Sequence, residues 1–110
     1  MRTPMQELTK KEAYQYLTSD IGKVVLYVYS PFCGTCRVTT KMLETVSEML
    51  PTVNIGTCNL NAMPGLAQDF KIKSVPYLAI VQNGKIAKEI YAFRSIPYLF
   101  ETVKKEMINS

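Results

Sequence analysis

A continuous apolar run, "KVVLYVY" from Lys23 to Tyr29, most constrains what this chain can fold into. After the lysine, every side chain in it is aliphatic or aromatic, whereas a strand with one solvated face would alternate apolar and polar residues. Such a run is typical of a strand that is covered on both faces in a mainly parallel sheet. The sequence therefore predicts an α/β fold, in which helices flank a central sheet on both faces.

The segments around this run alternate between strand and helix patterns. A short strand is expected at 5–8, and a helix at 9–18 begins with a capping box of Thr9 and Glu12. The segments expected after the run are a long helix at 34–50, a strand at 52–60, a short helix at 64–70, a hairpin at 76–91 that turns at Asn83-Gly84, and a helix at 96–107. Because the hairpin adds antiparallel strands, we expect a central mixed β-sheet.

Length and composition indicate the class of protein. The 110 residues, 12.5 kDa, suffice for one domain, residues 1–110. Neither a secretory signal nor a membrane-spanning run is visible, and three cysteines cannot all pair within one chain, so we expect a cytoplasmic protein. We also expect it to be a monomer. The net charge of +4 comes from Lys and Arg scattered among acidic residues, so we expect no nucleic acid or membrane as partner.

The motif "CGTC" places Cys33 and Cys36 directly after the apolar run, where three kinds of chemistry compete. A zinc site needs three or four ligands, but the chain has no histidine and only Cys58 besides this pair. A structural disulfide across so short a loop removes little entropy from the unfolded chain. We therefore expect neither a metal nor a structural disulfide at this site.

Thiol–disulfide exchange explains the placement of the pair. If Cys33 is the N-cap of the long helix, unsatisfied N–H groups and the helix dipole favour its thiolate. Cys33 is then the nucleophile, and Cys36, one turn further, resolves the mixed disulfide. Gly34 leaves room for a partner chain, and Phe32 gives the rim an apolar surface. No dissociable cofactor is needed.

The sequence resembles the thioredoxin family in "FCGTC" after "VVLYVY", in "SVPYL", in the Asn-Gly hairpin and in the terminal helix. The resemblance implies a thioredoxin fold and reduction of disulfide-containing proteins, with a flavin-containing thioredoxin reductase as electron donor. It also implies that Pro76 follows a cis peptide bond and lies against the active cysteines. Val75 would offer its backbone to an extended substrate segment.

Several positions depart from the family pattern. Thr35 stands where the family has proline, and its N–H can donate to the Cys33 thiolate. We therefore predict a redox potential above about −270 mV, towards the glutaredoxin range of about −200 to −230 mV. The family's buried acid and its lysine partner correspond to Tyr27 and Thr57, so deprotonation of Cys36 must rely on water or substrate, and reduction should be slower.

Other positions concern substrate range. Ala92, next to Phe93, replaces a glycine at the rim and predicts a narrower groove. Cys58 is interpreted as a buried packing residue. Two alternatives to a general reductase remain open: a specialist for one partner or for mixed disulfides of low-molecular-weight thiols, and a thioredoxin-fold binding module without catalysis.

Overall fold

The computed structural model describes residues 5–108 of the chain. Its elements are β1 (Met5–Glu7), α1 (Lys10–Thr18), β2 (Lys23–Tyr29), α2 (Gly34–Met49), β3 (Ile55–Asn59), α3 (Gly65–Asp69), β4 (Tyr77–Gln82), β5 (Lys85–Ile90) and α4 (Ile96–Met107). The strands form one sheet in the order β1-β3-β2-β4-β5. β2 pairs in parallel with β3 and antiparallel with β4, so the predicted mixed sheet is confirmed.

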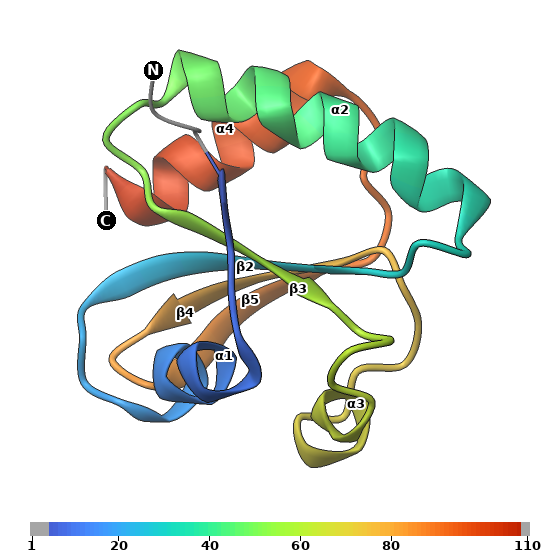
Figure 1. Cartoon of the computed structure of the whole chain (residues 1–110). Coiled ribbons are helices and arrows are strands. Elements are labelled where there is room, and N and C mark those ends of the chain that lie inside the picture. The colour runs from blue at the N-terminus through green and yellow to red at the C-terminus, as the bar shows by residue number, and fades with distance from the viewer. Residues whose placement is uncertain (1–4, 109–110) are drawn as a thin grey trace.

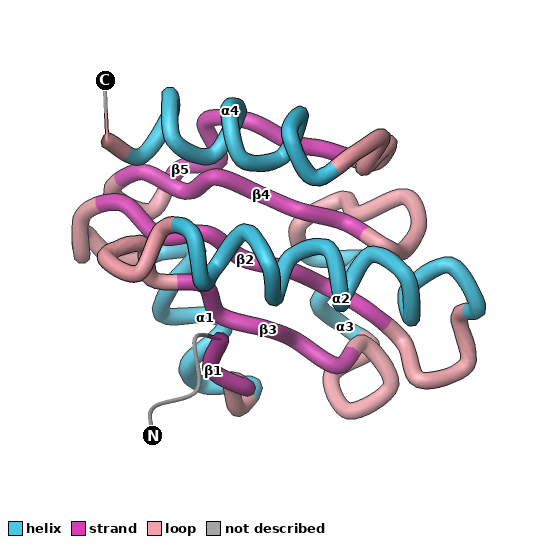
Figure 2. Tube along the Cα trace, turned by 90° about the horizontal axis from the view of Figure 1, so that it is seen from above, coloured by secondary structure: helices cyan, strands magenta, loops and turns pink. Residues whose placement is uncertain are grey.

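Helices cover both faces of the sheet. Figure 1 shows α2 and α4 above it and α1 and α3 below it. Seen from above in Figure 2, the strands run beneath α2 and α4, with the short β1 at one edge. The interior accordingly divides into two apolar layers, one on each face of the sheet.

The central strand β2 contributes to both layers. Val25 and Tyr27 pack in the layer beneath α2 and α4. Val24, Leu26 and Val28 pack in the layer of α1 and α3. All five are buried, as the apolar run predicts, because successive side chains of a strand point to opposite faces. Tyr27 therefore faces the helix that begins at the cysteine pair.

The ends of several elements differ by a few residues from the prediction. β3 begins at Ile55 rather than at residue 52, because the chain after α2 first makes a turn in which the Val53 N–H donates to the Leu50 carbonyl. The hairpin turn is as expected: Asn83 and Gly84 have φ values of 52° and 78°, which a type I′ turn requires. No helix within residues 5–108 combines the length and apolar character needed to cross a bilayer.

Candidate active site

Cys33 is the N-cap of α2, as predicted. Its backbone is extended, with φ −97° and ψ 113°, and its sulfur accepts a hydrogen bond from the Cys36 N–H at 3.3 Å. A 16-residue helix therefore starts directly beneath the sulfur, with its positive dipole end toward it. This geometry favours a negative charge on Cys33 Sγ.

Two further groups contact the Cys33 sulfur. The Thr35 hydroxyl lies 3.3 Å from it and donates to it when the sulfur is a thiolate. The Val75 carbonyl oxygen lies 3.8 Å away and accepts from Cys33 when it is a thiol. The Val75-Pro76 peptide bond is cis, as the resemblance implies. The structure thus brings Val75, 42 residues further along the chain, to the cysteine motif.

The two thiols of the motif differ in acidity. Burial opposes ionisation of Cys33, but hydrogen bonds from Cys36 and Thr35 outweigh it, so its pKa is lowered. Burial raises the pKa of Cys36, whose side chain is only 2% exposed, and its hydrogen bond to Cys33 raises it further. Cys33 is therefore the sulfur that loses its proton first. The two cysteines are not joined by a disulfide here.

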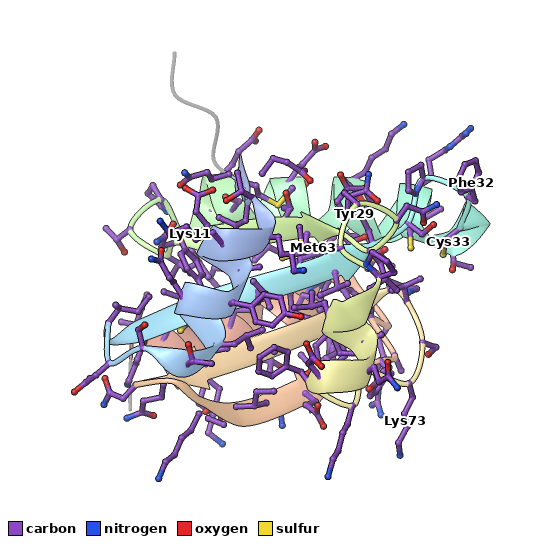
Figure 3. All side chains as sticks on the ribbon, turned by 60° about the horizontal axis from the view of Figure 1, so that its bottom comes forward. Lys11, Tyr29, Phe32, Cys33, Met63 and Lys73 are labelled. Atoms are coloured by element: carbon purple, nitrogen blue, oxygen red, sulfur yellow. The ribbon has the colours of Figure 1, made fainter. Side chains whose placement is uncertain are left out.

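The surroundings of Cys33 are open to a partner. Phe32 is 85% exposed, and Figure 3 shows Phe32 and Cys33 together at one end of the molecule. A Cβ built on Gly34 would meet nothing within 4 Å. Val75 and Pro76 are half-buried. Of the predicted substrate-binding residues, Phe32 and Gly34 flank Cys33 in the chain and Val75 contacts its sulfur, with Pro76 next in sequence.

Beneath the motif, Tyr27 links the central strand to α2. Its hydroxyl donates to the Cys36 carbonyl oxygen at 3.2 Å and lies 2.8 Å and 2.9 Å from the hydroxyl oxygens of Thr39 and Thr40. Its ring is fully buried and contacts Phe93 edge to face. Burial raises the pKa of the hydroxyl, so Tyr27 stays neutral. The sequence placed Tyr27 at the family's buried-acid position but did not predict these hydrogen bonds to α2.

Thr57 lies in a second polar cluster that the sequence did not predict. The Glu7 carboxylate accepts hydrogen bonds from Thr57 at 2.8 Å and from Tyr29 at 2.9 Å. Burial, followed by the bond to Glu7, raises the pKa of Tyr29 to about 12. Glu7 is thus the acid that occupies this corner of the sheet, and it is committed to Thr57 and Tyr29.

Two hollows lie along α2. One, of about 300 Å³, is lined by both cysteines of the motif together with Tyr29, Ser30, Pro31, Arg37, Thr40, Lys41 and Glu44. The other, of about 920 Å³, lies against β1 and β3 and contains neither cysteine. Tyr29, Thr40 and Glu44 line both hollows, so the two are neighbours. Only the smaller one is lined by Cys33 and Cys36.

Cys58 and Phe93 are both interior residues. Cys58 is fully buried in the layer of α1 and α3, and burial raises the pKa of its thiol to about 12. It is a packing residue, as interpreted from the sequence. Phe93 is 5% exposed, so any narrowing of the rim comes from the exposed Ala92 alone. In the part of the chain that the structure describes, no three His, Cys, Asp or Glu side chains gather as metal ligands would.

A sequence model of the thioredoxin family matches residues 4–105. The chain belongs to the thioredoxin family. It is similar to the thioredoxin-like protein YusE of Bacillus subtilis (strain 168), with 40% identity over 102 residues and 93% of each chain covered. It is also similar to a thioredoxin of Chlamydia pneumoniae, with 26% identity over 76% of this chain and 82% of the other.

Solved structures show the same fold. A thioredoxin from Malassezia sympodialis superposes with a TM-score of 0.81 at 17% identity, over 96% of this chain and 93% of the other. Mitochondrial thioredoxin 3 from Saccharomyces cerevisiae, in its oxidised form, gives 0.75 at 21% identity, over 94% and 96%. The thioredoxin fold predicted from the sequence is therefore confirmed. Thioredoxin-family membership and the neighbouring cysteine pair support thiol–disulfide oxidoreductase activity in general.

Proposed function

We propose that this thioredoxin-family protein reduces disulfide bonds in other proteins, with Cys33 as nucleophile and Cys36 as resolving thiol. One observation carries the proposal: the Cys33 sulfur caps α2, where the Cys36 N–H donates to it at 3.3 Å. That position favours the thiolate on the sulfur that a partner can reach, while Cys36 remains buried and protonated. This difference supports Cys33, rather than Cys36, as the sulfur that attacks first.

The reaction consists of two exchanges. The Cys33 thiolate attacks one sulfur of the substrate disulfide, which forms a mixed disulfide and releases the other substrate sulfur as a thiolate. Cys36 then loses its proton to water or substrate and attacks Cys33 Sγ, and the second substrate sulfur leaves. Two electrons pass to the substrate, and Cys33 and Cys36 end as a disulfide.

The rim around Cys33 supports a polypeptide substrate. Val75 lies in an accessible loop, with its carbonyl oxygen 3.8 Å from the sulfur, and an extended segment can pair with such backbone as an added strand would. Phe32 offers exposed apolar surface, and Gly34 leaves space above the first turn of α2. These are the groups we assign to substrate binding, together with Pro76.

After each reaction cycle the Cys33–Cys36 disulfide must be reduced again. We assign reduction of the Cys33–Cys36 disulfide to a flavin-containing thioredoxin reductase, in the cytoplasm, with the protein acting as a one-domain monomer. Electrons are stored on the two sulfurs themselves, so the protein needs no dissociable cofactor.

Trapping tests the assignment of roles. The Cys36→Ser variant should accumulate covalent mixed disulfides with partner proteins, because the resolving step is removed. The Cys33→Ser variant is the matched control and should accumulate none, since the attacking sulfur is gone. Equal yields from the two variants, or no covalent complex with the first, would refute the nucleophile assignment and would favour a binding module.

A specialist for few partners is the second candidate, favoured by the 85% exposure of Phe32 and by the side chain of Ala92 on the rim. The two candidates differ in a coupled assay with thioredoxin reductase, NADPH and insulin as a generic disulfide protein. Sustained NADPH consumption supports the general reductase. Trapped partners without consumption support the specialist.

A further inference from the structure

The 300 Å³ hollow beside Cys33 is a separate place from the Val75-Pro76 rim. Its lining comes from the end of β2, the following loop and the outer face of α2, and neither Val75 nor Pro76 contributes to it. Both Cys33 and Cys36 line it, so a molecule bound there lies beside the cysteine pair. Its volume is at the lower end of the range for small-molecule sites.

Two cations on α2 line this hollow. Arg37 and Lys41 are one turn apart, so their side chains share a face of the helix. Neither forms an ion pair or a side-chain hydrogen bond with another of residues 5–108. Their charges are therefore available to a ligand in the hollow that Cys33 also lines.

A carboxylate of opposite sign lies further along. Glu44, nearly one turn beyond Lys41, also lines the hollow and likewise has no ion pair in the described chain. The hydroxyl groups there are already committed, since Tyr29 donates to Glu7 and Ser30 bonds to Asn61. Charge should therefore decide which ligands bind in the hollow. Arg37 and Lys41 supply two positive groups nearer to Cys33 along α2, and Glu44 supplies one negative group beyond them.

We propose that this hollow binds an anionic, amino-acid-derived disulfide of low molecular weight, with its carboxylates at Arg37 and Lys41 and an ammonium group at Glu44. Protein disulfides use the Val75-Pro76 rim, and this ligand is a second substrate class for the same sulfur. The inference rests on the proposed function, because it requires Cys33 as nucleophile.

The chemistry balances without another reactant. The Cys33 thiolate attacks one sulfur of the small disulfide RSSR, forms Cys33–S–S–R and releases RS⁻, which takes a proton from water. Cys36 gives up its proton and attacks Cys33 Sγ, and the second RS⁻ leaves. One small disulfide becomes two thiols, and the protein dithiol becomes a disulfide.

A neutral disulfide serves as the reference that distinguishes weaker ligand binding from a less reactive Cys33 sulfur. Removing cations near Cys33 also weakens its thiolate, which slows attack on every disulfide alike. The informative quantity is therefore the rate constant for glutathione disulfide, which is anionic, divided by that for the neutral hydroxyethyl disulfide. Cystamine, which has ammonium groups and no carboxylates, serves as the cationic probe. Low salt keeps the charges unscreened.

Charge reversal on α2 tests the proposal with the full-length reduced protein. Arg37→Glu and Lys41→Glu should each lower the glutathione-to-hydroxyethyl ratio by about three- to tenfold, and should raise the relative rate with cystamine. Lys11→Glu makes the same charge change on α1, which Figure 3 shows away from Cys33, and should leave the ratio unchanged.

The outcomes separate the two proposals. An unchanged ratio in both α2 variants, or an equal fall in Lys11→Glu, would overturn the binding site. Failure of the unaltered protein to react with any of the disulfides, hydroxyethyl disulfide included, would overturn the nucleophile role of Cys33 itself. A ratio that falls only in the α2 variants supports the site.

The ammonium part has its own test. Dithiodiglycolate has two carboxylates and no ammonium group, whereas glutathione disulfide has both. The Glu44→Gln variant should lower the rate with glutathione disulfide about two- to fivefold relative to dithiodiglycolate. An unchanged ratio would remove Glu44 from the proposed site.

Discussion

The hydroxyl oxygen of Tyr27 lies 3.2 Å from the carbonyl oxygen of Cys36 and joins the central strand to the first turn of the active-site helix. The same hydroxyl lies within hydrogen-bonding distance of Thr39 and Thr40. A single neutral side chain thereby occupies the position of the buried acid that the family resemblance implies. In this chain Tyr27 links β2 to α2, in place of the proton acceptor that the resemblance implies.

Removing this hydroxyl should destabilise the protein. In Tyr27→Phe, the Thr39 and Thr40 hydroxyls lose a partner in the interior, at a cost of about 1–2 kcal/mol in the free energy of unfolding. Urea denaturation measures it. Tyr16→Phe is the control, because the Tyr16 hydroxyl makes one exposed hydrogen bond, from the Asn54 side chain, and should cost about 0.5 kcal/mol or less. Equal costs would contradict the structural role of Tyr27.

Thr35 should set the redox potential. Its hydroxyl, 3.3 Å from the Cys33 sulfur, stabilises the thiolate and hence the reduced protein. Thr35→Val removes the hydroxyl and keeps the N–H, so the potential should fall by about 30–60 mV, which corresponds to about 1.5–3 kcal/mol. Equilibration with glutathione, read by mass spectrometry, measures it.

The matched variants for this position are serine and proline. Thr35→Ser keeps the hydroxyl and should keep the potential of the unaltered protein. Thr35→Pro removes both donors, is tolerated in the first turn of a helix, and should be the most reducing of the series. A proline variant with an unchanged potential would show that neither donor acts on Cys33.

The acidity of Cys33 predicts how its alkylation depends on pH. Only the thiolate reacts, and a lowered pKa keeps the thiolate populated as pH falls, so iodoacetamide should modify Cys33 at pH 6 faster than a free peptide cysteine, whose pKa is about 8.5. Peptide mapping also provides an internal control: Cys58, buried with a pKa of about 12, should remain unmodified. Equal rates for Cys33 and the peptide would contradict the assignment.

The raised pKa of Cys36 predicts a slow resolving step. Cys36 attacks as a thiolate, and its raised pKa keeps it protonated near neutrality, so single-turnover release of substrate should accelerate from pH 7 to pH 9. Tyr27→Asp places a proton acceptor beneath the motif and should accelerate release at pH 7. Tyr27→Asn, similar in size without that basicity, is the control. Release that is independent of pH would contradict this account.

The sequence predicts the fold well because the decisive signals are local. The apolar run of β2, the Thr9 capping box and the Asn83-Gly84 turn each determine structure within a few residues, and each is present as expected. The N-cap position of Cys33 follows from the same logic, since a strand must end before a helix begins. The predicted start of β3 at residue 52 is wrong because the turn at Val53 depends on a backbone hydrogen bond, which residue types alone do not indicate.

Apart from the Val75 contact with Cys33, which the family resemblance implies, contacts between distant segments were not predicted. Glu7 meets Thr57 and Tyr29 only because β1, β3 and β2 lie side by side in the sheet. That Arg37 and Lys41 have no ion-pair partner among residues 5–108 is visible only once the surrounding acids are placed. The assignment of Cys33 as nucleophile and Cys36 as resolving thiol remains a prediction, which the sequence and the structure both support.

The linkage at Tyr27 has a consequence for behaviour in acid. Its raised pKa keeps the phenol protonated throughout the range in which Cys33 gains or loses its charge. The hydrogen bonds between Tyr27 and the first turns of α2 therefore stay the same whether the Cys33 sulfur is charged or neutral. Protonation of Cys33 at low pH should therefore stop its attack on disulfides without changing the hydrogen bonds of Tyr27 beneath the motif. The attack should resume as soon as the pH returns to neutral.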